Sequence, residues 1–428
     1  MVCSRLAVGG VGLVLWFTTA NAFADDWPQW LGPSRNGTTT ETVAPWKKTP
    51  TIVWRRPVGN GYSSPIIVGN TVYAHAAVAD KDAEEVLALD LQTGQPRWTD
   101  SYPRASYRSQ LGVGPRTTPV VNDGRLYTYG ITGTLSCYDV ANGKRLWQTN
   151  PYETYKVSLP GFGVCSSPVV VAGRVVVLVG GGGSAVVAYE AQTGKVAWKG
   201  LDEPASSASP IALIRGTGKD RRTEVVVQTT LRIAGLNPET GAIQWEHPLV
   251  FQPAGVSPTP LVIGETLVCT TQETGTLALK FPKAEIRNLQ PLWWKQDLNS
   301  YFSTGTLGPE NSVLVVTNQQ TPLPRADLRC LDLATGNELW LKKGVGYFHA
   351  GVLATGDGKL LFLDDTGSLI LAEISRKEFK QLSKAGVCRG TLINPAFSGG
   401  RFVARDDKEL VCVKLEAATA STSTPTPK

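Results

Sequence analysis

Few residues of this 428-residue chain have the types and the spacing that enzyme chemistry requires. Its three histidines, His75, His247 and His349, lie far apart and lack the spacing of metal ligands. No Gly-x-Ser-x-Gly segment indicates a nucleophilic serine. The glycine run 180–183 lacks the Gly-Lys-Ser/Thr ending of a phosphate-binding loop. The sequence therefore offers no support for metal-dependent, serine-nucleophile or nucleotide chemistry.

Cysteine offers a second route to chemistry, because the chain contains seven. Three of them occupy one slot of the repeat described below, where other copies have Ala or Gly, so we interpret them as small core residues: Cys137, Cys330 and Cys412. Whether Cys165, Cys269 or Cys388 form disulfides stays open. No Cys-x-x-Cys-His haem attachment motif is present.

A third set of side chains lies in the segments between the repeated units. It combines aromatic rings, basic groups and one imidazole: Tyr62, Arg108, Arg116, Tyr301, Phe302, His349 and Arg389. If these segments converge at one end of a ring-shaped fold, the side chains form a cationic, aromatic rim. Such a rim suits an anionic small molecule, a glycan or an extended peptide. The alternative is that the same residues fill a central channel and pack the loops together.

The elements that must position this rim are read from five segments that align without a gap. They are 88–98, 137–147, 188–198, 235–245 and 330–340. In each, a polar residue stands third, Gly stands seventh and Trp stands eleventh, as in Asp90, Gly94 and Trp98. This spacing predicts a hairpin in which the carboxylate or amide accepts turn amides and Gly supplies a positive φ. The Trp would then pack on the neighbouring unit.

A second marker precedes each hairpin: a Ser/Thr/Pro cluster followed by an apolar run. Counting this marker gives eight positions, near Pro65, Pro119, Pro168, Pro210, Pro260, Thr304, Gly351 and Pro395. The predicted fold is an all-β, eight-bladed β-propeller of four-stranded antiparallel blades. The eighth unit lacks a fourth strand, and we expect residues 51–58, which contain Trp54, to supply it and close the ring.

The two ends of the chain predict export. Arg5, the apolar run 6–17 and the small residues of 22–24 are typical of a cleaved signal peptide over residues 1–24. Its removal takes away one cation, so the formal charge falls from +6 to +5. We expect residues 25–50 to form an extension packed on the propeller, 51–416 the propeller itself, and 417–428 a disordered tail.

Composition also constrains location and partners. Without another long apolar run, we expect no transmembrane segment after cleavage and a periplasmic or secreted location. Charges of both signs are dispersed, which argues against nucleic acid as a partner. We expect a monomer.

The hairpin unit resembles the tryptophan-docking motif of the quinoprotein-type, pyrroloquinoline quinone (PQQ)-like repeat family. Residues 26–37, Asp-Trp-Pro-Gln-Trp-Leu-Gly-Pro-Ser-Arg-Asn-Gly, followed by 61–65, Gly-Tyr-Ser-Ser-Pro, are similar to exported, non-dehydrogenase members. The family includes PQQ-dependent alcohol dehydrogenases and the non-catalytic BamB-type scaffold of outer-membrane protein assembly. The dehydrogenases imply a Trp floor, an adjacent Cys pair and a calcium held by acidic and amide side chains.

This chain departs from the dehydrogenase pattern. No two cysteines are adjacent, and we assign each Trp to the signal, to the segment before the first blade or to an outer strand, leaving none for the ring centre. We therefore predict no cofactor, with PQQ and calcium disfavoured, and no catalytic residues. The expected function is a non-catalytic exported scaffold or ligand-binding module similar to BamB-type proteins. The alternatives are a PQQ-dependent alcohol dehydrogenase-like quinoprotein and a glycan-binding module.

Overall fold

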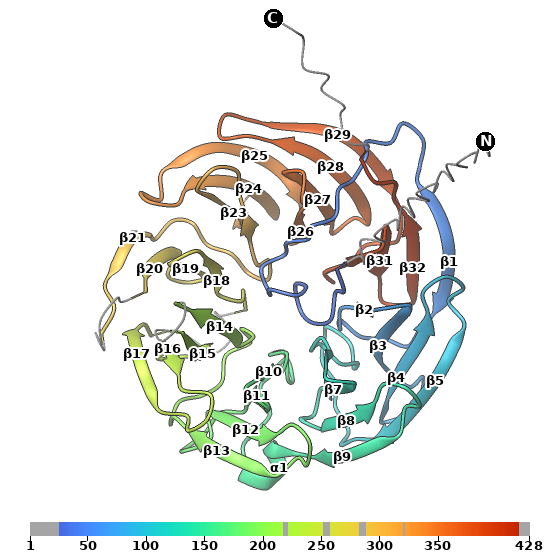
Figure 1. Cartoon of the computed structure of the whole chain (residues 1–428), viewed down its shortest axis with the longest axis vertical. Helices are drawn as coiled ribbons and strands as arrows, with labels where there is room; N and C mark the ends of the chain where they lie inside the picture. The colour runs from blue at the N-terminus through green and yellow to red at the C-terminus, as the bar shows by residue number, and fades with distance from the viewer. Residues whose placement is uncertain (1–24, 217–220, 251–256, 282–287, 320–321, 419–428) are drawn as a thin grey trace, which may run out of the picture.

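The computed structural model describes residues 25–216, 221–250, 257–281, 288–319 and 322–418, and it confirms an eight-bladed propeller. Figure 1 shows the eight four-stranded antiparallel sheets arranged in a ring, whose central axis is called the channel here. The predicted signal peptide and nearly all of the predicted tail lie outside the described residues.

Each of the first four blades uses four consecutive strands. Blade 1 contains β2 (Ile66–Val68), β3 (Thr71–Ala77), β4 (Ala83–Asp90) and β5 (Pro96–Pro103). Blade 2 contains β6 (Val120–Asn122), β7 (Arg125–Tyr129), β8 (Leu135–Asp139) and β9 (Arg145–Thr149), followed by the helix α1 (Pro151–Tyr155). Blade 3 contains β10 (Val169–Val171), β11 (Arg174–Leu178), β12 (Val186–Glu190) and β13 (Val196–Gly200). Blade 4 contains β14 (Ile211–Arg215), β15 (Arg222–Gln228), β16 (Arg232–Leu236) and β17 (Ile243–Pro248).

The last four blades follow the same plan with one exception. Blade 5 contains β18 (Leu261–Ile263), β19 (Thr266–Thr270), β20 (Thr276–Lys280) and β21 (Pro291–Lys295). Blade 6 contains β22 (Thr306–Leu307), β23 (Ser312–Gln319), β24 (Arg325–Asp332) and β25 (Glu338–Gly346). Blade 7 contains β26 (Ala350–Ala354), β27 (Lys359–Asp364), β28 (Ser368–Ile374) and β29 (Phe379–Gly386). Blade 8 combines β30 (Ala396–Ser398), β31 (Arg401–Arg405) and β32 (Glu409–Lys414) with β1 (Thr51–Pro57).

The ring closes through its first strand, as the sequence predicts. Strand β1 pairs antiparallel with β32, with Thr51 opposite Lys414 and Trp54 opposite Cys412. The indole of Trp54 then donates to the Leu91 carbonyl of blade 1 at 2.9 Å. Closure therefore joins the two ends of the chain in one sheet and locks that sheet against the first blade.

The repeated Trp residues connect successive blades. Trp98 on blade 1 donates to the Val140 carbonyl of blade 2 at 2.9 Å and lies over Gly143, where an added Cβ would come within 2.5 Å of the indole. The same kind of hydrogen bond, from an indole N–H to a backbone carbonyl of the next blade, is made by four further residues: Trp147, Trp198, Trp293 and Trp340. The hairpin Gly is therefore needed for the close approach of the indole as well as for its positive φ of 74° at position 143.

Trp245 is the exception to this docking. In blade 5, the next blade, residues 281–290 between β20 and β21 contain no Gly, and the fully buried Trp245 instead donates to the Glu224 carboxylate of its own blade at 2.9 Å. Its ring packs against Phe281 of blade 5 with centroids 5.6 Å apart. An aromatic contact replaces the Trp–Gly contact where the motif is interrupted.

The Ser/Thr-Pro marker also has an inter-blade role. The Thr118 amide donates to the Ser167 hydroxyl, and the Ser167 amide to the Ser209 hydroxyl, both at 2.9 Å. The Ser209 and Thr259 amides continue the series to the hydroxyls of Thr259 and Thr304. These hydrogen bonds form part of a ring around the channel, just before the inner strands begin.

The cysteines of the repeat are core residues, as predicted: Cys137, Cys330 and Cys412 are fully buried and free. Cys165, Cys269 and Cys388 are free as well, so no disulfide joins any of the six cysteines that the structure describes. No described helix has the length and hydropathy of a membrane span.

Candidate ligand-binding site

Residues 27–37, called the plug here, enter the channel from one end. The amide of Trp27 donates to the Ile67 carbonyl of blade 1 at 2.8 Å, and the Val121 amide of blade 2 donates to Pro28 at 2.9 Å. Figure 1 shows this segment in blue, running to the centre of the ring. The plug thereby extends the innermost strands of two blades.

The far end of the plug is tied to the opposite side of the ring. The Thr306 hydroxyl of blade 6 donates to the Asn36 carbonyl at 2.8 Å, and the Ala354 amide of blade 7 donates to Gly37 at 2.7 Å. Between these anchors the backbone turns sharply, and the non-glycine residues Leu31 and Arg35 adopt φ values of 57° and 53°. Left-handed backbone at non-glycine residues persists where the surroundings enforce it.

Arg35 fixes the plug inside the channel. Its side chain is buried, and its guanidinium donates to the carbonyls of Pro168 and Pro210, which directly precede the inner strands of blades 3 and 4. Its Nε donates to Gln29 Oε1 at 2.9 Å. Burial lowers the pKa of Arg35 to about 9, so the group is still charged at neutral pH. Its described partners are carbonyl and amide oxygens, and no described carboxylate neutralises it.

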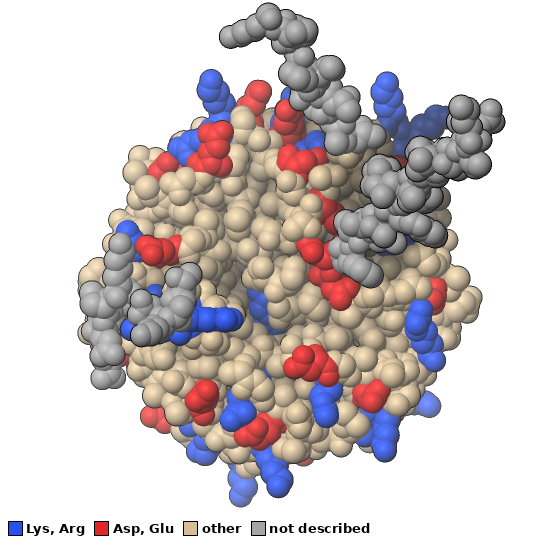
Figure 2. Space-filling model, in the orientation of Figure 1, with Lys and Arg blue, Asp and Glu red and all other residues tan. Residues whose placement is uncertain are grey.

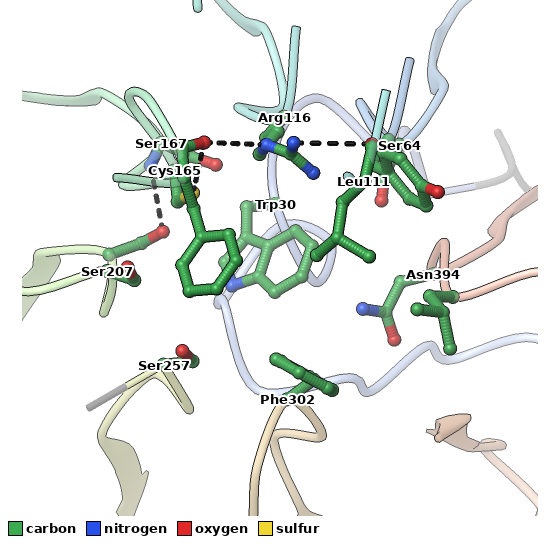
Figure 3. Close-up of a pocket in the computed structure, with 14 residues that line it drawn as sticks. Trp30, Ser64, Leu111, Arg116, Cys165, Ser167, Ser207, Ser257, Phe302 and Asn394 are labelled. Atoms are coloured by element: carbon green, nitrogen blue, oxygen red, sulfur yellow. Dashed lines mark hydrogen bonds between the residues drawn. The ribbon is translucent and has the colours of Figure 1, made fainter. Parts of the chain in front are cut away.

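The other end of the channel is hollowed into a cavity of about 150 Å³, called the cup here. Its floor is Trp30 of the plug, whose indole donates to the Thr259 hydroxyl at 2.9 Å. The blades follow one another clockwise in Figure 1 and anticlockwise around the cup in Figure 3, so the two views face opposite ends of the channel. The plug therefore provides the base of a recess at the end that Figure 3 shows.

The wall of the cup comes from the segments that lead into the inner strands. It is rich in hydroxyl groups and aromatic rings. The hydroxyl residues are Ser64, Ser167, Ser207, Ser209 and Ser257, and the wall rings are Tyr62, Phe162 and Phe302. Leu111, Cys165, Leu392, Asn394 and Arg116 complete the described lining, which contains no carboxylate and no histidine.

Arg116 is the one cation among the described lining residues. Its Nε donates to the Phe162 carbonyl at 2.7 Å, and its Nη2 donates to the Ser109 hydroxyl at 2.9 Å. Its guanidinium carbon stands 5.1 Å from the centre of the Tyr62 ring, in cation–π geometry. Nη1 has no partner among the residues that the structure describes, and Figure 3 shows the guanidinium at the edge of the cavity.

Cys165 places a thiol in the same wall. Its Sγ lies 3.6 Å from the Gly163 carbonyl and 3.7 Å from that of Phe162. Burial raises the pKa of the thiol, so the thiolate, which is the nucleophilic form, is disfavoured at neutral pH. The cup thus offers hydrogen-bond donors, rings and one positive charge, and its described lining offers no carboxylate and no imidazole.

The structure brings three of the seven predicted rim residues together in the cup: Tyr62, Arg116 and Phe302. Tyr301 lies beside them, with its ring 6.0 Å from that of Phe302. That any of these residues binds a ligand stays a prediction.

The other three lie elsewhere. Arg108 pairs with Asp82 at 2.8 Å, next to a separate peripheral recess. His349 is buried and bonds the Ser303 hydroxyl at 2.9 Å, and burial lowers its pKa to about 4. Arg389 is exposed outside the cup.

One inference from the sequence was wrong. Trp30 lies at the centre of the ring, although counting Trp residues by strand left none for that position. The count assigned Trp30 to the segment before the first blade, and only the tertiary path of that segment brings the indole into the channel. Phe162 and the serine hydroxyls were also missed as lining, although they belong to loops and markers that the sequence does delimit.

A central Trp reopens the question of a quinone, and the other residues do not fit one. A calcium ion prefers carboxylate and carbonyl oxygens, and the described lining supplies no carboxylate. Cys165 is not followed by a second cysteine that could form an adjacent-Cys lid. The donor set of this cup therefore differs from that of a PQQ–calcium site.

Comparison with known proteins places the chain among related propellers. The profile of the family described as outer membrane protein assembly factor BamB matches residues 45–167 and 161–342. Quinohemoprotein alcohol dehydrogenase of Comamonas testosteroni is 29% identical over 158 residues, which is 35% of this chain and 21% of that protein. The chain thus matches about a fifth of that relative's length.

Solved structures show the same fold at low identity. BamB of Moraxella catarrhalis superposes with a TM-score of 0.59 and 15% identity, covering 86% of this chain and all of that one. The Comamonas testosteroni dehydrogenase gives a TM-score of 0.62 at 14% identity, covering 94% and 82%. At such identities the likeness concerns the fold, which binding scaffolds and dehydrogenases share.

Proposed function

This chain belongs to the PQQ-like propeller family that is described as outer membrane protein assembly factor BamB, and we propose that it is an exported, non-catalytic binding protein. In this proposal the cup recognises a partner. One observation carries the proposal. The plug, anchored by Arg35, forms the base of an open cup that holds exposed rings and a cation that no described carboxylate neutralises.

The chemistry of the cup favours binding over turnover. Acid–base catalysis most often uses an imidazole or a carboxylate within hydrogen-bond reach of the substrate, and the described lining has neither. The guanidinium of Arg116 is a hydrogen-bond donor with no acceptor atom, which suits the binding of an anion. Phe162 and Phe302 are 46% and 41% exposed. Exposed aromatic side chains that gather around a recess are typical of a binding surface.

The rival function is that of a quinoprotein alcohol dehydrogenase, which the name of the curated relative raises. Reconstitution tests it directly: the purified protein is incubated with PQQ and calcium, and alcohol-dependent dye reduction is followed. We expect no quinone absorbance retained on the protein and no dye reduction above the protein-free control. Clear turnover would overturn the proposal.

The binding role is tested by site-specific cross-linking in the exported fraction. A photoreactive residue replaces Phe302 in the cup, and a matched one replaces Val196, which is 49% exposed on the outer strand β13. We expect one defined cross-linked partner from position 302 and none from position 196. Equal cross-linking at both positions would show that the cup is not the recognition site.

A further inference from the structure

We propose that the cup binds a single aromatic ring that carries a carboxylate, an inference that rests on the proposed binding function. Three properties of the described cup support this class of ligand: its size, its aromatic rings and its positive charge.

Size limits the part of the ligand that enters the cup to about one ring. The cavity measures about 150 Å³. An apolar cavity of this volume holds a molecule such as benzene, whereas drug-sized ligands occupy pockets of about 300–1,000 Å³. One six-membered ring with a short acidic arm fits this volume, and any larger part of a ligand would lie outside the mouth of the cup.

The rings of the cup favour an aromatic occupant. Trp30 forms the floor, and Phe162 and Phe302 line the wall, from the segments that lead into blades 3 and 6. Both phenylalanine side chains keep more than two fifths of their surface exposed. An inserted ring would bury these surfaces and gain offset or edge-to-face contacts worth about 0.5–1.5 kcal/mol per aromatic pair beyond the burial itself.

The charge of the cup favours an anion. Arg116 has a guanidinium nitrogen, Nη1, without a partner among the described residues, and its other nitrogens are already held in place by Phe162, Ser109 and Leu111. Ser64 lines the neighbouring part of the wall and is only 3% exposed. Its hydroxyl has no partner among the described residues. Because the guanidinium is fixed in advance, a carboxylate gains a charge-assisted hydrogen bond at little entropic cost.

Two sources present this chemistry. One is a free aromatic acid, and the other is the C-terminal aromatic residue of a polypeptide, whose backbone would leave through the open mouth of the cup. Both share a ring and a carboxylate a few bonds apart, so a peptide with a free end and a small acid distinguish the sources.

The test is calorimetric titration of the mature protein with 3-phenylpropionate, N-acetylphenylalanine and a pentapeptide that ends in Phe. The same pentapeptide with an amidated C-terminus removes the charge and keeps the ring. We expect binding of the acids and at least about tenfold weaker binding of the amide, since a hydrogen bond to a charged group contributes about 1.5–3 kcal/mol. If only the free-ended peptide binds, the ligand is a chain end; if the small acids bind equally well, it is a free acid.

The matched variants are Arg116→Met in the cup and Arg125→Met on strand β7 of the following blade, outside the cup. We expect Arg116→Met to weaken binding of the acids at least about tenfold and to bring acid and amide to the same affinity. Arg125→Met should bind like the unaltered protein. If Arg116→Met proves unfolded by circular dichroism, Phe302→Ala serves as the second variant, with the same weakening expected.

Failure of this inference and failure of the proposed function are distinguishable. Equal affinity for acid and amide, or no binding of any acid, overturns the inference. If cross-linking at position 302 still captures a defined partner in that case, the binding function stands and only the ligand class is wrong.

Discussion

Glu84 is the most heavily engaged buried carboxylate among the described residues of blade 1. Tyr102 donates its hydroxyl proton to Glu84 Oε2 at 2.6 Å, and the Ile131 amide of blade 2 donates to Oε1 at 2.9 Å. His75 Nε2 lies 2.9 Å from the Tyr102 oxygen. Gly130 makes room for the carboxylate, because an added Cβ there would lie 2.1 Å from Oε2. A charged hydrogen-bond network thus joins the first two blades.

This network predicts a specific loss of stability in acid. Burial alone would raise the pKa of Glu84, but hydrogen bonds and charge from His75, with bonds from Tyr102 and Ile131, outweigh it and hold the pKa below its usual value. The stabilising contribution is therefore complete above the unfolded pKa of about 4.3 and is lost as the pH falls through the lower folded pKa.

The measurement is urea unfolding at pH 7 and at several values below pH 4.5. Glu84→Gln should lower the free energy of unfolding at pH 7 by about 1–3 kcal/mol, because the amide oxygen can accept from only one of Tyr102 and Ile131 and the amide NH2 then faces the other donor. It should also flatten the acid dependence. Glu239→Gln, in an exposed turn, should change neither, and an acid profile unaltered by Glu84→Gln would contradict the assignment.

The plug is the element that turns a propeller into a cup. A channel open at both ends would have no floor, and the floor here is Trp30 on a segment held by Arg35. The plug reaches blades 1 and 2 at one end and blades 6 and 7 at the other, with blades 3 and 4 reached through Arg35. Its position therefore depends on the whole ring having formed.

Arg35→Met should loosen the plug without unfolding the ring. The substitution removes charge-assisted hydrogen bonds to two buried carbonyls, each worth about 1.5–3 kcal/mol. Hydrogen exchange followed by mass spectrometry should show faster exchange of the Ile67 and Val121 amides, which bond the plug. Arg125→Met is the control, and unchanged protection of both amides in Arg35→Met would show that Arg35 does not anchor the segment.

At the scale of the molecule, stability depends on joining the ends of the chain. An open ring would leave β32 with an unpaired edge and Trp54 without its contact on blade 1. Charges are dispersed at this scale too: on the face seen in Figure 2, basic and acidic side chains alternate around the ring and neither sign dominates.

A disulfide across the closing sheet tests this dependence. Thr51 and Lys414 are paired in register, are both exposed, and lie at the end of the β1–β32 ladder. In Thr51→Cys/Lys414→Cys the oxidised protein should unfold with a free energy higher by about 4 kcal/mol than the reduced protein, because the crosslink encloses nearly the entire ring. Each single substitution should show no such redox dependence, and equal stabilities of the oxidised and reduced double variant would mean that ring opening is not part of unfolding.

Local sequence determined most of the fold. The eleven-residue units predict their own hairpins from local chemistry. The Asp or Asn accepts hydrogen bonds from the turn amides, the Gly adopts the positive φ, and the Trp docks on the next blade. The unpaired strand of Trp54 and the incomplete eighth unit identified the closure for the same reason. The three cysteines that occupy a repeat position held by Ala or Gly in other units were correctly predicted to be core residues.

Tertiary structure alone decided the site. The path of each loop decides which of its residues lie at the channel. Arg116 and Phe302 line the cup, whereas His349 is buried in the core. The path of the plug has no local signature, because Arg35 bonds carbonyls 133 and 175 residues away, and no periodic pattern encodes such contacts. Repeats are determined by short-range chemistry that the sequence displays, whereas a cup built from eight blades and a returning terminus exists only once the ring has closed.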